Sequence, residues 1–218
     1  MQKLFPILIS IFQILLFAHF SFGQEPTPFS QEVKDIKTKY MDAPKGGIVF
    51  TGSSSIRLWH SLQEDFPDKQ LLNTGFGGSQ THQLLHYLDE LVLNYAPTKV
   101  LIYEGDNDIS AGKPLPRIVE EFNELIHRLR SANPTVEIFI ISAKPSPSRW
   151  QLKADYEKLN ASLKKLSKKN KNVTFVDIWT PMLTKEGKPD PSLFVEDDLH
   201  MNARGYLIWK NAIAKVLK

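Results

Sequence analysis

The chain has 218 residues, and its 27 lysines and arginines nearly balance 24 aspartates and glutamates, which leaves a formal net charge of +3. A dedicated nucleic-acid-binding protein usually carries a concentrated basic stripe, whereas the lysine-rich stretch at 164–171 lies at the end of an expected helix, where cations complement the helix dipole. We therefore expect no nucleic-acid partner. The sequence contains no cysteine, which excludes disulfide bonds and argues against a lipid anchor on cysteine.

Residues 1–23 are typical of an export signal. Lys3 gives a short cationic start, residues 4–20 are almost entirely apolar, and Ser21-Phe22-Gly23 offers small side chains where a signal peptidase cuts. We expect a signal peptide over 1–23 with cleavage near Gly23-Gln24, a secreted or periplasmic product, and no stable membrane anchor after cleavage. An uncleaved N-terminal anchor is the alternative, although the apolar run is shorter than the roughly 20 residues that span a bilayer.

Five short apolar runs alternate with helical patterns along the rest of the chain. The runs are rich in β-branched residues and lack polar alternation, as expected for strands that are covered on both faces. These strands are expected at 47–51, 70–73, 99–103, 136–142 and 173–178. Helices are expected at 31–41, 58–64, 80–93, 116–131, 152–169 and 203–217. The alternation predicts an α/β fold with a parallel sheet, helices on both faces and a ligand site beyond the carboxyl ends of the strands.

The domain organisation follows from this pattern. Residues 24–44 are expected to form an N-terminal tail and helix, and residues 45–218 the main domain. The length suits one compact domain, and we find no internal repeat or linker.

Gly52-Ser53-Ser54-Ser55 follows the first expected strand at a turn into a helix. At such a turn the hydroxyl and the backbone N–H of Ser54 can face the same pocket, but a free hydroxyl needs a neighbouring base to act as a nucleophile. Taken alone, the tetrapeptide favours a helix cap or a phosphate-binding turn instead.

Asp197 and His200 lie three residues apart, just before the last expected helix. The carboxylate can accept a hydrogen bond from the imidazole, fix its tautomer and stabilise the imidazolium that forms when a serine loses its proton. A capping pair or half of a metal site is the alternative. His82 and His86, four apart on an expected helix, could bind a metal, but no third ligand is apparent, so we expect neither a metal nor another cofactor.

Two further motifs offer hydrogen-bond donors for an oxyanion. Asn73-Thr74-Gly75-Phe76-Gly77-Gly78 follows the second strand, and its glycines let the backbone approach a ligand closely. A dinucleotide fingerprint would need a third glycine where Gln80 stands, so a nucleotide cofactor is not favoured. In Gly105-Asp106-Asn107-Asp108, which follows the third strand, Asn107 can supply a neutral amide donor, although an Asx-turn is the simpler interpretation of that motif alone.

In this order, the four motifs resemble the blocks of the SGNH-hydrolase superfamily, also called GDSL-like lipases and acylhydrolases, over roughly 45–217. The Asn-x-Gly-x-Gly-Gly form looks closest to the platelet-activating-factor acetylhydrolase-like branch. The resemblance implies a flavodoxin-like three-layer α/β/α sandwich with a five-stranded parallel sheet in the order 2-1-3-4-5. It also implies site residues: a triad of Ser54, Asp197 and His200, and an oxyanion hole of Ser54, Gly78 and Asn107.

The chain departs from the family pattern at Ser53, where relatives usually carry aspartate in a Gly-Asp-Ser block. Because three serines are adjacent, the register is ambiguous, and the position two residues after Gly52 favours Ser54 as the nucleophile. Asp198 stands where relatives often have glycine, and we expect its carboxylate to be solvated.

The activity implied is that of an exported serine esterase. The segments that could wall its pocket carry or adjoin Trp150, Trp179 and Phe194, which suit a sugar or a short acyl chain, although packing against the scaffold explains them equally well. We expect removal of acetyl or other short acyl groups from a small-molecule or carbohydrate-linked ester. The alternatives are a lysophospholipase or thioesterase, a catalytically inactive member acting as a binding module, and a flavodoxin-like nucleotide binder.

Overall fold

The computed structural model describes residues 28–217 and contains one parallel sheet. Its five strands run in the order β2-β1-β3-β4-β5. Their bounds are β1 Ile48–Gly52, β2 Leu71–Asn73, β3 Lys99–Tyr103, β4 Glu137–Ile141 and β5 Val173–Val176. All four pairings are parallel, and at their carboxyl ends Phe50 lies opposite Asn73 and Gly52 opposite Tyr103. The predicted fold class and strand order are therefore confirmed.

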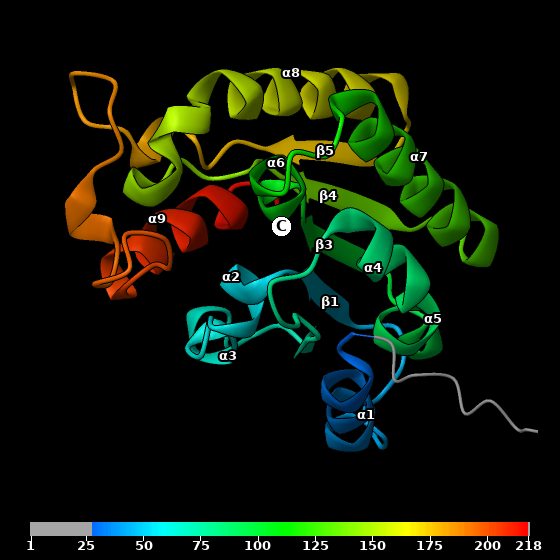
Figure 1. The fold of residues 1–218 in the computed structure, drawn as a ribbon. Coiled ribbons are helices and arrows are strands. Elements are labelled where there is room, and N and C mark those ends of the chain that lie inside the picture. The colour runs from blue at the N-terminus through cyan, green and yellow to red at the C-terminus, as the bar shows by residue number, and fades with distance from the viewer. Residues whose placement is uncertain (1–27, 218) are drawn as a thin grey trace, which may run out of the picture.

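Helices cover both faces of the sheet and make three layers (Figure 1). One face carries α1 (Ser30–Lys39), α4 (Thr81–His86), α5 (Leu88–Leu91), α7 (Leu115–Ala132) and α8 (Lys153–Lys169). The other carries α2 (Ser54–Arg57), α3 (Leu62–Asp65) and α9 (Ala203–Ala214). The short helix α6 (Asp106–Ser110) follows β3 directly.

Two apolar cores fill the spaces between these layers. Along β3, Val100 and Ile102 point into one core, whereas Leu101 and Tyr103 point into the other, because successive side chains of a strand face opposite ways. The predicted apolar stripe of α7 is buried, and it consists of Ile118, Phe122, Leu125, Ile126 and Leu129. The strands carry few polar side chains because both of their faces are covered.

Two local predictions about helices were wrong, and one helix was not predicted. The expected helix at 58–64 is replaced by α2, which already begins at Ser54, and by α3. The expected helix at 80–93 breaks at Tyr87, whose ring packs edge-on against Phe76 and whose hydroxyl donates to the carbonyl of Pro28. Such long-range contacts override helical periodicity, which is a local signal. Helix α6 was not expected, because its sequence also suits a turn.

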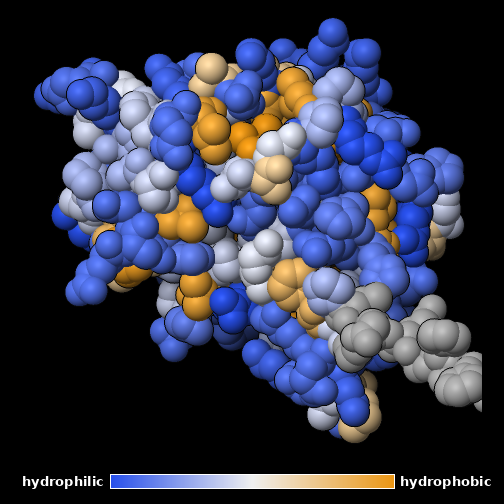
Figure 2. Space-filling view, viewed as in Figure 1, coloured by the Kyte–Doolittle hydropathy of each residue, from blue (hydrophilic) through white to orange (hydrophobic). Residues whose placement is uncertain are grey.

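The predicted signal peptide, residues 1–23, lies outside the described residues and stays a prediction. Between residues 28 and 217, no helix combines the length and the apolar character needed to cross a bilayer. The surface in Figure 2 is largely hydrophilic, with separate hydrophobic patches.

Candidate active site

The turn from β1 into α2 presents Ser54 at the carboxyl end of the sheet. Gly52 has φ +119°, and a side chain there would place its Cβ 2.0 Å from the carbonyl oxygen of Tyr103, so only glycine fits. Ser53 keeps an extended backbone and donates its N–H to that same oxygen at 3.0 Å. Ser54 is then the first residue of the helix and is half-buried.

His200 and Asp197 complete a chain of hydrogen bonds with Ser54. The distance from Ser54 Oγ to His200 Nε2 is 2.9 Å, and that from His200 Nδ1 to Asp197 Oδ2 is 2.5 Å. The second carboxylate oxygen, Oδ1, accepts from the backbone N–H of His200 at 2.8 Å. Partial burial opposes ionisation of Asp197, but the hydrogen bonds from His200 outweigh it and lower the pKa of the carboxyl to about 2. An ionised Asp197 accepts from Nδ1–H, which leaves Nε2 free to accept from the serine.

The Asp-x-x-His segment is held mainly by its own backbone. Val195 donates to the carbonyl of His200 at 2.9 Å, and Asp198 donates to the carbonyl of Val195 at 3.0 Å. Asp198 has φ +57°, a left-handed conformation that favours glycine, which gives a physical reason why relatives place glycine there. Its side chain is exposed, as predicted.

Asn107 approaches the turn of the predicted nucleophile from α6. Its Nδ2 donates to Ser53 Oγ at 2.8 Å and to the carbonyl of Ser79 at 2.9 Å. A Cβ added to Gly78 would lie 3.9 Å from Nδ2, so this glycine backbone borders the amide. The five predicted site residues thus gather around the carboxyl ends of β1, β2 and β3, and their catalytic roles remain predictions. Ser53, the departure from the family pattern, is buried and accepts from Asn107.

The glycine-rich loop after β2 is tied to both neighbouring elements. Asn73 accepts from the N–H of Gly75 at 3.1 Å and donates from Nδ2 to the carbonyl of Ile56 at 2.7 Å. The N–H of Gly77 donates to Glu32 of α1 at 2.8 Å. Asn73 and Glu32 therefore brace the loop, while Gly78 stays exposed and able to donate to a ligand.

The comparison with known proteins agrees with this arrangement. The model of the GDSL-like lipase/acylhydrolase family matches residues 46–208. The chain belongs to this family. The predicted resemblance is confirmed, and membership supports an ester hydrolase.

Solved structures share the fold of this hydrolase. One is a Streptococcus pneumonia protein provisionally named platelet activating factor, with 23% identity and a TM-score of 0.77, covering 86% of this chain and 94% of that one. Another is a GDSL-like lipase from Bacteroides thetaiotaomicron, with 22% identity and a TM-score of 0.72, covering 85% and 96%. A third is a catalytic mutant of an acetylxylan esterase from Geobacillus stearothermophilus, with 16% identity and a TM-score of 0.60, covering 79% and 94%. No curated protein matches the sequence. At these identities the likeness shows the fold alone.

A buried charged cluster lies behind the predicted oxyanion hole of the hydrolase, and the sequence did not reveal it. Asp106, next to Asn107, accepts from Lys144 Nζ at 2.7 Å and from Arg149 Nη1 at 2.5 Å. The hydroxyls of Tyr103 and Tyr156 each donate to it at 2.6 Å. Burial opposes ionisation of Asp106, but the two cations outweigh it and hold the pKa of the carboxyl well below its usual value. The only sequence signal for this cluster was Asp106 itself, which stands next to the predicted donor Asn107.

The two histidines weighed as a metal pair differ in their surroundings, and the structure places two potential co-ligands beside His82 that the sequence did not reveal. The His86 ring packs edge-on against Tyr87. His82, Asp108 and Glu121 bring three potential ligand atoms within 4.8 Å of one another. Lys113 Nζ lies 3.0 Å from His82 Nδ1, 2.6 Å from Asp108 Oδ1 and 2.9 Å from Glu121 Oε2. The lysine ammonium therefore already supplies a cation to this set.

The three aromatic residues considered for the pocket differ in their surroundings. Trp150 stacks on Trp179 at 5.9 Å between ring centroids, and Trp179 stacks on Tyr156 at 6.2 Å. Both tryptophans are half-buried. Phe194 is 6% exposed and packs in the core beside α9, so it is part of the scaffold.

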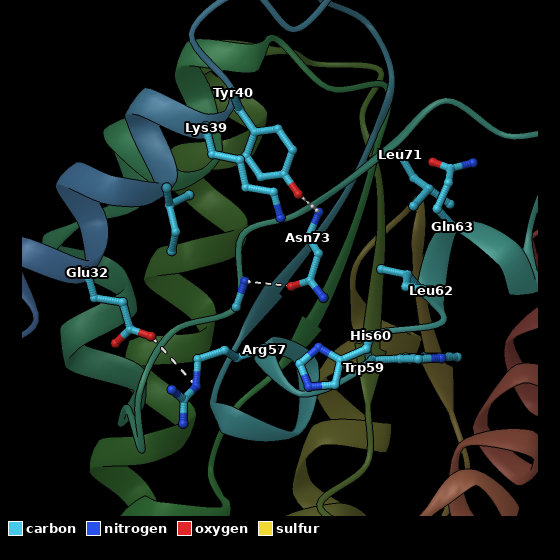
Figure 3. Close-up of a pocket in the computed structure, with 12 residues that line it drawn as sticks. Glu32, Lys39, Tyr40, Arg57, Trp59, His60, Leu62, Gln63, Leu71 and Asn73 are labelled. Carbon is cyan, nitrogen blue, oxygen red and sulfur yellow. Dashed lines mark hydrogen bonds and ion pairs between the residues drawn. The ribbon is translucent and has the colours of Figure 1, made fainter.

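A cavity of about 360 Å³ lies beside the nucleophile helix, between α1, α3 and the loop after β2 (Figure 3). Arg57, one turn after Ser54, lines it and faces Glu32 at 3.6 Å. Within the described residues, neither Ser54 nor His200 belongs to its lining. The predicted triad instead lies at the surface, with the side chain of His200 26% exposed and that of Asp197 47% exposed.

Proposed function

We propose that this protein is a serine esterase that hydrolyses carboxylic esters through an acyl-enzyme on Ser54. The observation that carries the proposal is the continuous hydrogen-bond chain Ser54 Oγ–His200 Nε2–Asp197 Oδ2. Residues far apart in the sequence meet in the geometry that acyl transfer needs: a nucleophile, a base and an orienting carboxylate.

The reaction proceeds in two steps. Ser54 Oγ attacks the ester carbonyl while His200 Nε2 takes its proton, and Asp197 stays ionised throughout. The oxyanion accepts hydrogen bonds from the N–H groups of Ser54 and Gly78 and from Asn107 Nδ2, which gives up its hydrogen bond to Ser53 Oγ. When the intermediate collapses, His200 returns the proton to the leaving alcohol. Water then attacks the acyl-enzyme with His200 as the base, which releases the acid and restores the serine.

Short acyl groups, acetyl above all, are the proposed substrates, on small molecules or on carbohydrate. The shallow, accessible position of His200 suits an ester on a large carrier, and a fold shared with an acetylxylan esterase agrees with this choice. The half-buried Trp150 offers an aromatic surface to a sugar. Export by residues 1–23 would bring the enzyme to such substrates outside the cytoplasm.

Hydrolysis of p-nitrophenyl acetate, butyrate and octanoate tests the proposal. The expected order of kcat/KM is acetate, then butyrate, then octanoate. Ser54→Ala should reduce every rate to background, whereas Ser55→Ala, in the adjacent buried serine, should retain activity within about threefold because its hydroxyl lies outside the hydrogen-bond chain.

A serine-reactive phosphonate gives a second reading that needs no substrate. Mass spectrometry should place the label on Ser54, which also settles the register among the three adjacent serines. If the native protein hydrolyses the esters no faster than background and the phosphonate does not label it, the result would instead favour a binding module. Release of acetate from acetylated xylan, compared with cleavage of a lysophospholipid, separates the proposed substrate class from the alternative one.

A further inference from the structure

The Asn107 amide is held at both of its polar atoms. Its Nδ2 donates to Ser53 Oγ and to the carbonyl of Ser79, and its Oδ1 accepts from Arg149 Nη2 at 3.0 Å. The two ends of an amide are almost equal in shape, but a guanidinium can only donate hydrogen bonds. Arg149 therefore requires the oxygen end to face it, which turns the NH₂ end toward Gly78 and the nucleophile turn.

Arg149 is itself fixed by the buried cluster. Its Nη1 donates to Asp106, which also accepts from Lys144 and is only 4% exposed at its side chain. Two cations share this one carboxylate, and burial raises the pKa of the neighbouring hydroxyls of Tyr103 and Tyr156, which keeps them neutral. The cluster therefore carries a net positive charge directly behind the amide.

The segment that carries Arg149 also contacts the loop that carries His200. In the 3-10 turn Pro147–Leu152, the N–H of Ser148 donates to the carbonyl of Asp198 at 3.1 Å, and the next residue is Arg149. One short segment thus spans from the Asp-x-x-His loop to the predicted oxyanion donor.

We propose that Arg149 is the positioning residue of the oxyanion hole: its guanidinium orients the Asn107 amide, and with Lys144 and Asp106 it places a positive charge behind that amide. This rests on the proposed esterase function. As the ester oxygen becomes negative, Asn107 Nδ2 exchanges its hydrogen bond to Ser53 Oγ for one to the oxyanion, while Arg149 keeps the oxygen end of the amide in place. The contribution of this oriented donor is therefore greatest in the transition state. Arg149 acts through Asn107, and it should therefore govern kcat more than KM.

Steady-state kinetics of Arg149→Met on p-nitrophenyl acetate test the inference. We expect kcat to fall about 30-fold with KM within about twofold of the native value, a smaller loss than removal of the donor itself. Arg128→Met is the matched control. Arg128, on α7, likewise bridges a carbonyl and a carboxylate, which here belong to Leu85 and Asp89. Its kcat should stay within about twofold.

Chemical rescue separates positioning from a general loss of structure. Arg149→Gly leaves a space for a free guanidinium ion, and added guanidinium should raise its kcat at least tenfold while leaving the native enzyme and Arg128→Met unchanged. A merely destabilised fold would not regain activity from a denaturing ion. Failure of rescue, or a kcat of Arg149→Met within threefold of native, would overturn the inference.

A crystal structure of Arg149→Met gives a readout that does not depend on activity. The Asn107 side chain should leave its contacts with Ser53 and Ser79 or adopt a second orientation, whereas an unchanged amide would contradict the inference. A native protein that neither hydrolyses esters nor reacts with the phosphonate would refute the proposed function separately, and the amide orientation would still decide the role of Arg149.

Discussion

The two sides of the predicted site are built in different ways. On the base side, Asp197 and His200 lie three residues apart in an accessible loop that is held largely by hydrogen bonds within residues 194–201. On the oxyanion side, Asn107 rests on a buried ion cluster assembled from residues that follow β3 and β4. The predicted base is thus oriented mainly by contacts within its own loop, whereas the Asn107 amide is oriented by a contact with Arg149, which lies 42 residues away along the chain.

Removing the base should have the largest effect. In His200→Ala we expect kcat to fall about 10⁴-fold or more, because no group remains to take the proton from Ser54. The unfolding temperature should change little, since the loop is exposed and held by its backbone. A fall below tenfold in kcat, with the protein folded, would remove His200 from the triad.

Loss of the amide donor should cost less. In Asn107→Ala we expect turnover to fall about 10²–10³-fold, as for other single oxyanion donors. KM should stay nearly constant because the donor acts on charge that develops during the reaction. The measurement is steady-state hydrolysis of p-nitrophenyl acetate, and a loss of less than threefold would exclude Asn107 from the site.

Stability should separate the two sides more sharply than activity. Asp106→Asn removes the carboxylate that Lys144 and Arg149 share, and leaving buried cations unpaired should lower the free energy of unfolding by about 3–5 kcal/mol. The matched change on the exposed side, Asp197→Asn, should lower it by less than about 1 kcal/mol because solvent screens that pair. Urea unfolding of both variants measures the contrast, and equal losses would mean that the sides do not differ in this way.

The pH dependence of the Asp106 contribution has a defined sign. The folded pKa of Asp106 lies below its unfolded value, so its stabilisation is fully present above the unfolded pKa and is lost as pH falls toward the folded one. The difference in unfolding free energy between the native protein and Asp106→Asn should therefore be largest at neutral pH and shrink below about pH 4.

Glu104 should show the opposite trend. Glu104 is fully buried, and its Oε2 lacks a hydrogen-bond partner among the described residues. Burial is the larger cause and the nearby charge of Asp108 the smaller one that raise its pKa well above the usual range. A raised folded pKa stabilises the fold at low pH, and this stabilisation is lost as pH rises. Glu104→Gln should therefore gain stability over the native protein as pH rises from the unfolded pKa toward the raised folded pKa, with a slope of at most about 1.4 kcal/mol per pH unit. Unfolding at pH 5 and pH 8 checks this, and a constant difference would contradict it.

Much of the fold could be predicted because its signals are local. The apolar runs and the stripe of α7 gave the strand number and layers, and the resemblance supplied the strand order. Ser54, Gly78, Asn107, Asp197 and His200 were predicted from four short motifs, and the structure brings them together. The break at Tyr87 was missed because its cause, the packing on Phe76, joins residues that periodicity does not relate.

The sequence by itself determined which residues could take part in acyl transfer, because motif spacing and hydrophobic period reflect short-range geometry. Only the tertiary structure decided what supports them. Lys144 and Arg149 lie 38 and 43 residues along the chain from Asp106, and in the sequence they look like ordinary loop cations. They become a buried cluster because the carboxyl ends of β3 and β4 meet at one edge of the sheet, where an unpaired charge would be too costly to leave in the interior.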